Sequence, residues 1–343
     1  MDIQIILDHV NSVYTDKDTV SGKVLLETAT PIDISTIAVR LSGIAISRLN
    51  GKRSSEVHKI LRRTQVVFPP KQQLDSALGQ KFTLRSGTHE FPFSITFPHF
   101  AECFKLDPHE DDLAASCARV RLSKRLPSVH LLRRLPPSTG TSNDIAEVKY
   151  SVNVVIKKPG LFKGTMKMSR DIFLNPLSEP TSQQEPVFQQ QQQQPITIDP
   201  EISNFSSAPS FLLSVQLLNG SSLLQTLPLP LRITLTKQTT FTCPAILKNF
   251  QTMVVEHTHT DVNNSPSYHR QCWIVQTMSN MHEVVGDPDA PAGAELNLSN
   301  ALWSSRPLPP KLVSSFETCK IKRSYELRLK VRFQFGELPK VRF

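Results

Sequence analysis

The sequence lacks any long hydrophobic run, since no apolar stretch approaches the roughly 20 residues that a membrane-spanning helix needs. Its first residues, Met-Asp-Ile-Gln-Ile-Ile-Leu-Asp, also lack the basic region and the small-residue cleavage site of a secretory signal. These two absences argue against a membrane-embedded or secreted protein. We therefore expect the chain to reside in the cytoplasm.

Cysteine is scarce, with five residues among 343, and no two of them form a Cys-x-x-Cys pair. This pattern excludes the common zinc-binding and thiol-exchange motifs. We expect these thiols to be buried or without a role. They are Cys103, Cys117, Cys243, Cys272 and Cys319.

Signatures of catalysis are missing as well, because the chain has no Gly-x-Ser-x-Gly, no His-Glu-x-x-His and no glycine-rich phosphate loop. The 39 lysines and arginines exceed the 30 aspartates and glutamates, which gives a formal charge of +9. Such an excess of positive charge favours binding to nucleic acid, to an anionic membrane or to an acidic protein. Without zinc-finger spacing, a ribonucleoprotein motif or a capped recognition helix, nucleic acid is the weakest of the three. We expect no enzyme activity, no cofactor and no nucleic-acid partner.

What the chain does contain is two-residue alternation, which is clearest in residues 87–98. One face of this segment carries His89, Phe91, Phe93, Ile95 and Phe97. The other carries Glu90, Pro92, Ser94 and Thr96. This pattern predicts a half-buried strand. Because Pro92 has no backbone N–H, the strand should lie at a sheet edge or contain a bulge.

Similar alternation recurs along the chain, and no long segment shows helical periodicity. In residues 37–46 the apolar positions change parity at Gly43, which predicts a bulge at the glycine. Further stripes occupy residues 148–156, 211–217, 231–235 and 325–335. We therefore predict an all-β protein.

A segment rich in proline, serine, glutamate and glutamine separates two groups of strands, and Gln189 to Gln194 form an uninterrupted tract within it. Such a tract has nothing to bury in a core and is typical of a linker. The predicted fold is two antiparallel immunoglobulin-like β-sandwich domains joined by this glutamine-rich linker. The domains span residues 1–178 and 209–343, with the linker at 179–208.

Several short motifs follow one another in a fixed order. The first are Val20-Ser-Gly-Lys-Val24, the strand 37–43, Gly87-Thr-His-Glu-Phe-Pro-Phe93, Leu135-Pro-Pro-Ser138 and the strand 148–156. The last are Pro309-Pro310, Ser315-Phe-Glu-Thr318 and Tyr325-Glu-Leu327. Their order and spacing resemble the arrestin family, specifically the fungal arrestin-related trafficking adaptors.

The resemblance implies a non-catalytic adaptor that recognises the tails of membrane transporters or receptors. It would promote their ubiquitin-dependent endocytosis or endosomal sorting through a HECT-type ligase, and it would associate peripherally with the plasma membrane or endosomes. Such adaptors usually present Pro-Pro-x-Tyr to ligase WW domains. This chain has no such motif, and its nearest approach is Ser265-Pro266-Ser-Tyr268. An alternative is a structural subunit of an endosomal coat, resembling the arrestin-like component of retromer.

An insertion at about residues 102–142 is acidic at first and then purely basic. Its basic residues are Arg119, Arg121, Lys124, Arg125, Arg133 and Arg134. They form either a solvated loop or a contact for anionic lipid or acidic cargo tails, where each basic side chain contributes on the order of 1 kcal/mol.

A third alternative is a metal-dependent β-sandwich enzyme. His257, His259 and Asp261 alternate and would share one face of a strand, where His269, His282 or Glu283 would complete a metal site. We favour a solvent-facing stripe, because two-residue histidine spacing is common and no supporting second set of ligands can be seen.

Overall fold

The computed structural model confirms the all-β expectation. The residues that it describes are 1–9, 13–49, 54–70, 81–101, 104–105, 134–159, 164–177, 190–197, 210–220, 222–240, 242 and 244–335. Within these ranges the helical structure is a single 3₁₀ turn at Asn300–Leu302, and the remaining elements are strands. No helix in the same ranges is long and apolar enough to cross a membrane.

The chain divides into two compact units, each built from more than one stretch of sequence. Unit 1 comprises Met1–Ser178, Thr258–His269 and Val313–Ser324. Unit 2 comprises Glu179–His257, Arg270–Leu312 and Tyr325–Phe343. Two late segments therefore complete the first unit, so the division differs from the contiguous domains 1–178 and 209–343 expected from the sequence.

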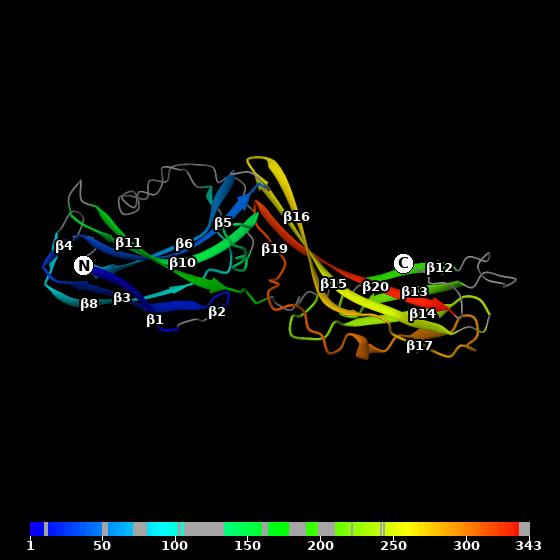
Figure 1. Cartoon of the computed structure of the whole chain (residues 1–343). Helices are drawn as coiled ribbons and strands as arrows, with labels where there is room; N and C mark the ends of the chain where they lie inside the picture. The colour runs from blue at the N-terminus through cyan, green and yellow to red at the C-terminus, as the bar shows by residue number, and fades with distance from the viewer. Residues whose placement is uncertain are drawn as a thin grey trace. The chain divides into compact units, whose positions relative to one another are not determined.

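Unit 1 contains two main sheets that form two layers (Figure 1). The three-stranded sheet has the order β1 (Asp2–Leu7), β3 (Thr19–Thr28) and β8 (Gly87–Thr96). The six-stranded sheet has the order β2 (Val13–Tyr14), β11 (Thr165–Leu174), β10 (Ala146–Lys157), β5 (Thr36–Arg48), β6 (Ser55–Phe68) and β9 (Phe104–Lys105). A small pair adds β4 (Ile32–Ile34) and β7 (Phe82–Leu84).

The alternation in β8 behaves as the sequence predicts. Phe91, Phe93 and Ile95 are buried in the core of unit 1, while Pro92 and Ser94 are exposed. The strand pairs only with β3 in its sheet, so Pro92 lies on an edge strand, as expected from its missing N–H.

A tyrosine on β10 connects two of the sequence motifs, the strand 148–156 and Leu135-Pro-Pro-Ser138. Tyr150 is buried and donates its hydroxyl hydrogen to the carbonyl of Pro136 at 2.7 Å. Burial raises the pKa of this phenol well above its usual value, which keeps it a donor. A Cβ at Gly43 would lie 2.6 Å from Cε1 of the Tyr150 ring, so glycine on β5 makes room for it.

The predicted bulge is real but belongs to the neighbouring strand. The register of β5 with β6 shifts between Gly43 and Ile44, which pair with Leu61 and Lys59, so that Ile60 is the extra residue. Because Ile60 lies on β6, β5 keeps its parity, and Ala45 rather than Ile44 is buried. The expected change of face at Gly43 is therefore wrong.

Unit 2 also contains two main sheets. One has the order β12 (Gln190–Thr197), β13 (Ser210–Leu217), β14 (Leu231–Lys237) and β18 (Glu295–Asn297). The other has the order β16 (Ser265–Met278), β15 (Ala245–Val262), β20 (Ile321–Phe335) and β19 (Phe316–Glu317), with β17 (Glu283–Val285) paired to β15. Of this sheet, β19 and residues 258–262, 265–269 and 321–324 belong to unit 1. The core includes the stacked rings of Phe211 and Phe335, whose centroids are 4.5 Å apart.

The glutamine tract is part of this fold, which corrects the expected linker at 179–208. Residues 190–197 form β12 and pair antiparallel with β13, with Gln192 opposite Val215. Ile196 is 1% exposed and belongs to the core of unit 2. The rest of the expected linker, residues 179–189 and 198–208, lies outside the described residues.

Candidate functional site

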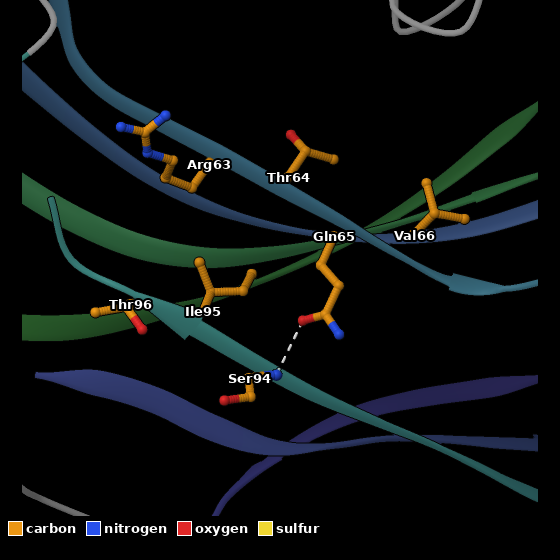
Figure 2. Close-up of a pocket in the computed structure, with 7 residues that line it drawn as sticks. All are labelled: Arg63, Thr64, Gln65, Val66, Ser94, Ile95 and Thr96. Atoms are coloured by element: carbon orange, nitrogen blue, oxygen red, sulfur yellow. Dashed lines mark hydrogen bonds between the residues drawn. The ribbon is translucent and has the colours of Figure 1, made fainter. Parts of the chain in front are cut away.

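A hollow of about 480 Å³ lies in unit 1 between β6 of one sheet and β8 of the other (Figure 2). We call it the β6–β8 groove. It is lined by Arg63, Thr64, Gln65, Val66, Ser94, Ile95 and Thr96.

The groove follows the free edge of β8. The backbone N–H of Ser94 donates to Oε1 of Gln65 at 2.9 Å, so it points away from β3 and toward β6 (Figure 2). Backbone groups of alternate residues on an edge strand face the same way. At the next such position toward the N-terminus, Pro92 has no N–H to satisfy. One side chain therefore covers the available donor at this part of the edge.

The other edge of the same sheet is covered in a similar way. The guanidinium of Arg170, on β11, donates to the backbone carbonyl of Ile5 on β1 at 2.7 Å. Both outer strands of the three-stranded sheet thus hold a polar contact from the six-stranded sheet. Such contacts protect sheet edges from unwanted pairing and can be exchanged for those of a bound strand.

The lining of the groove combines a cation, hydroxyls and apolar surface. Arg63 and Thr64 are exposed on β6, and Ser94 and Thr96 are exposed on β8. This arrangement suits an extended peptide that carries an acidic side chain, because Arg63 supplies charge while the β8 edge supplies backbone groups. Sequence reasoning did not identify the groove. The signal was the pair Arg62-Arg63 within a strand, but the sequence does not show which of the two lines the groove.

Residues 102–103 and 106–133 of the basic insertion lie outside the described residues, and they include Arg119, Arg121, Lys124, Arg125 and Arg133. Arg134 is described. It is half-buried and forms an isolated antiparallel bridge with Phe100.

Pro266 and Tyr268 lie at the start of β16, directly after a two-residue turn. Asn263 and Asn264 form this turn with φ values of 50° and 64°, which asparagine tolerates better than most residues. The ring of Tyr268 is 48% exposed and lies 4.7 Å from the ring of His259, centroid to centroid. The segment is therefore a strand, whereas WW domains bind a polyproline helix.

The residues of the suggested metal site are paired with other groups. Nε2 of His257 lies 3.2 Å from a carboxylate oxygen of Glu326, and Asp261 forms an ion pair with Lys320 at 2.8 Å. His257, His259 and Asp261 do share the more exposed face of β15. In the part of the chain that the structure describes, no three histidine, cysteine, aspartate or glutamate side chains are grouped to hold a metal ion.

A second polar site in unit 1 was not anticipated. Nδ1 of His58 lies 3.3 Å from Sγ of Cys319, and Nε2 of the same ring lies 2.9 Å from Oε1 of Glu56. The other carboxylate oxygen of Glu56 accepts the N–H of Asn263 at 2.9 Å. We call Glu56, His58 and Cys319 the His58 cluster. Nothing in the sequence pairs residues so far apart.

The described units define the chain as a β-sandwich protein with side-chain-covered sheet edges. Residues 3–104 match the family model for the arrestin (or S-antigen) N-terminal domain. This stretch is thus similar to an arrestin N-terminal domain, and the match includes both strands of the β6–β8 groove. The similarity supports an arrestin-like adaptor role in general. No curated protein matches the chain.

Proposed function

We propose that the protein is a non-catalytic adaptor that recognises the cytoplasmic tails of membrane transporters or receptors and promotes their ubiquitin-dependent endocytosis or endosomal sorting. The observation that supports it is an arrestin N-terminal domain whose edge strand β8 borders an open groove with Arg63 at its rim. A cargo tail would add to this edge as an extended segment and place an acidic side chain at Arg63.

The contact between Gln65 and Ser94 predicts how substitutions in the groove change the affinity for a peptide. Its amide oxygen occupies the Ser94 N–H that a bound peptide would use, so it competes with the peptide. Gln65→Ala removes the competitor and should strengthen peptide binding a few-fold. Arg63→Glu reverses the charge and should weaken binding of acidic tails about tenfold or more, because a charge-assisted hydrogen bond contributes about 1.5–3 kcal/mol.

The test is an array of synthetic peptides that covers the cytoplasmic tails of transporters and receptors from the native cell, probed with the full chain. Arg62→Glu is the matched control, since Arg62 carries the same charge on the same strand but does not line the groove. Equal loss in Arg62→Glu and Arg63→Glu would contradict the groove. Copurification with coat subunits in place of cargo and ligase would contradict the adaptor function.

The basic insertion would supply the peripheral membrane contact. Its attraction to anionic lipid is screened over about 8 Å at physiological ionic strength, so binding to liposomes that contain phosphatidylserine should fall steeply with added salt. Replacing its six basic residues with serine should abolish most of the binding. Unchanged binding by that variant would assign membrane contact to another surface. The residues are Arg119, Arg121, Lys124, Arg125, Arg133 and Arg134.

The ligase contact is the remaining part of the proposal. Without Pro-Pro-x-Tyr, a HECT-type ligase would bind through a second adaptor or through Pro266 and Tyr268. A pull-down with isolated WW domains, comparing the parent with Tyr268→Ala, separates these routes. Loss of binding in the variant supports direct contact, and absence of binding by the parent supports an intermediary.

A further inference from the structure

The His58 cluster orders a thiol, an imidazole and a carboxylate in a single line of contacts. His58 lies in the middle, with one ring nitrogen toward Cys319 and the other toward Glu56. The ring is 1% exposed and Glu56 is 8% exposed, while Cys319 is half-buried. Cys319 is thus the most exposed member of the cluster.

A tight turn holds Cys319 in this position. The turn joins β19 to β20, and within it the N–H of Thr318 donates to the carbonyl of Ile321 at 2.7 Å. The Thr318 hydroxyl oxygen accepts the N–H of Ile321 at 2.9 Å. Next to the thiol, Lys320 bonds to the carboxylate of Asp261 at 2.8 Å. These contacts fix the backbone on either side of the sulfur.

The surroundings favour a charged ring beside the sulfur. Burial opposes the charge on His58, but hydrogen bonds with Cys319 and Glu56 outweigh it and raise the pKa of the imidazole. For Glu56, burial likewise acts against ionisation, yet the Asn263 N–H and His58 lower the pKa of the carboxyl. Lys320, which also lowers the pKa of the Glu56 carboxyl, forms an ion pair with Asp261 at 2.8 Å, and Lys105 on β9 is opposite His58 in the strand register. A thiol in contact with such a cation loses its proton readily.

We propose that Cys319 is a reactive thiolate, paired with the imidazolium of His58, and that it is a site of modification by peroxide. The thiolate sulfur attacks one peroxide oxygen, the O–O bond breaks, and a sulfenic acid forms on Cys319. The departing hydroxide takes the proton from His58 and leaves as water. Sulfur is oxidised by two electrons and the peroxide is reduced by the same two.

The chain supplies its own control for this chemistry. Cys272 on β16 is an exposed thiol that contacts the sulfur of Met253 at 3.7 Å. It is thus more accessible than Cys319, and its hydrogen-bond contact is a thioether rather than an imidazole. Accessibility and activation therefore predict opposite orders of reactivity at low pH.

The first experiment measures alkylation of the folded full chain by iodoacetamide between pH 6.0 and 8.5, with each cysteine quantified by peptide mass spectrometry. An ordinary thiol with a pKa of about 8.5 should lose about 50-fold in rate between pH 8.5 and 6.5, as its thiolate fraction falls. For Cys319 we expect a loss below about threefold, and a smaller loss than at Cys272. Equally steep profiles, or no labelling of Cys319 in the folded chain, would overturn the proposal.

The second experiment links the reactivity to His58 and extends it to peroxide. His58→Gln should restore a steep pH profile at Cys319, and Glu56→Gln should move the profile partway. Glu56→Gln keeps the histidine, so the comparison survives if His58→Gln fails to fold. Low concentrations of hydrogen peroxide followed by a sulfenic-acid trap should label Cys319 before Cys272. Earlier labelling of Cys272, or a Cys319 profile that neither variant changes, would show that the cluster does not activate the thiol.

Discussion

Gly22 explains why one of the motifs needs a glycine. A Cβ at this position on β3 would lie 2.2 Å from the backbone carbonyl oxygen of Ile6 on β1. The obstacle is backbone rather than a flexible side chain, so the two strands would have to move apart. The glycine in Val20-Ser-Gly-Lys-Val24 is therefore required by the close approach of β1 to β3.

Gly22→Ala should accordingly lower the free energy of unfolding by about 2 kcal/mol or more, which exceeds the usual effect of one added methyl group. Ser21→Ala, one residue earlier in the same strand, is the control and should cost less than about 1 kcal/mol. Urea unfolding of the full chain measures both. Equal effects of the two substitutions would mean that β1 adjusts without strain.

The His58 cluster predicts how stability depends on pH. The pKa of His58 is raised, so its contribution is complete below the usual value near 6.5 and is lost as pH rises through the raised pKa. The pKa of Glu56 is lowered, so its contribution is present above the usual value near 4.5 and is lost as pH falls through the lowered pKa. Unit 1 should therefore be most stable at pH values between the acid-side loss from Glu56 and the alkaline-side loss from His58.

Urea unfolding at half-unit steps from about pH 2 to pH 9 tests this expectation. In His58→Gln the loss on the alkaline side should shrink, whereas in Glu56→Gln the loss on the acid side should shrink. If both variants keep the profile of the parent, other groups govern the pH dependence.

At the scale of the element, β12 gives the clearest test of the corrected linker. Ile196 is almost fully buried in the core of unit 2. Ile196→Ala should therefore cost about 2–5 kcal/mol, as expected for a core isoleucine, whereas a linker residue would cost almost nothing. The control is Ile274→Ala on β16, because Ile274 is 60% exposed. Hydrogen exchange of residues 210–217 reports whether β13 has lost its partner.

The strands that the sequence predicts best are those in which apolar and polar residues alternate strictly. Val148, Tyr150 and Val152 are buried as expected, and so are Val331, Phe333 and Phe335 at the end of β20. Alternation suffices there because one face of the strand meets a core and the other meets solvent. The glutamine tract has no such alternation. The core residue of its strand is Ile196, which follows the tract.

The sites were harder to predict because they arise from tertiary contacts. Cys319 and His58 are 261 residues apart in the sequence, so no local pattern places them together. To predict the β6–β8 groove, one must know how two strands of different sheets lie against each other. A run of basic residues, by contrast, is visible in the sequence, and it predicts a contact at the basic insertion rather than at Arg63.

For the whole molecule, the set of segments that form unit 1 predicts that residues 1–178 alone are an incomplete domain. They lack Ile321, which is 1% exposed in the core of unit 1, and the carbonyl of Asp261, which accepts a hydrogen bond from Ser47. Glu56 and His58 also lose their partners Asn263 and Cys319. A fragment of residues 1–178 should therefore show faster hydrogen exchange in residues 55–61 than the full chain.

Adding the peptide of residues 313–324 to that fragment should slow the exchange in part, while a scrambled peptide should not. Identical exchange in the fragment and the full chain would show that residues 1–178 form a self-sufficient domain.

The same arrangement has a consequence for how the protein is made. Domains of a growing chain usually fold in the order in which they emerge from the ribosome. Here the first unit waits for residues 258–269 and then for residues 313–324, which emerge after most of the second unit. Until then, the surface that receives Ile321 and the thiol contact of His58 are open to other molecules. The N-terminal sandwich is thus started first but completed only when nearly the whole chain has emerged, and chaperones that bind apolar surface have a long time to act on it.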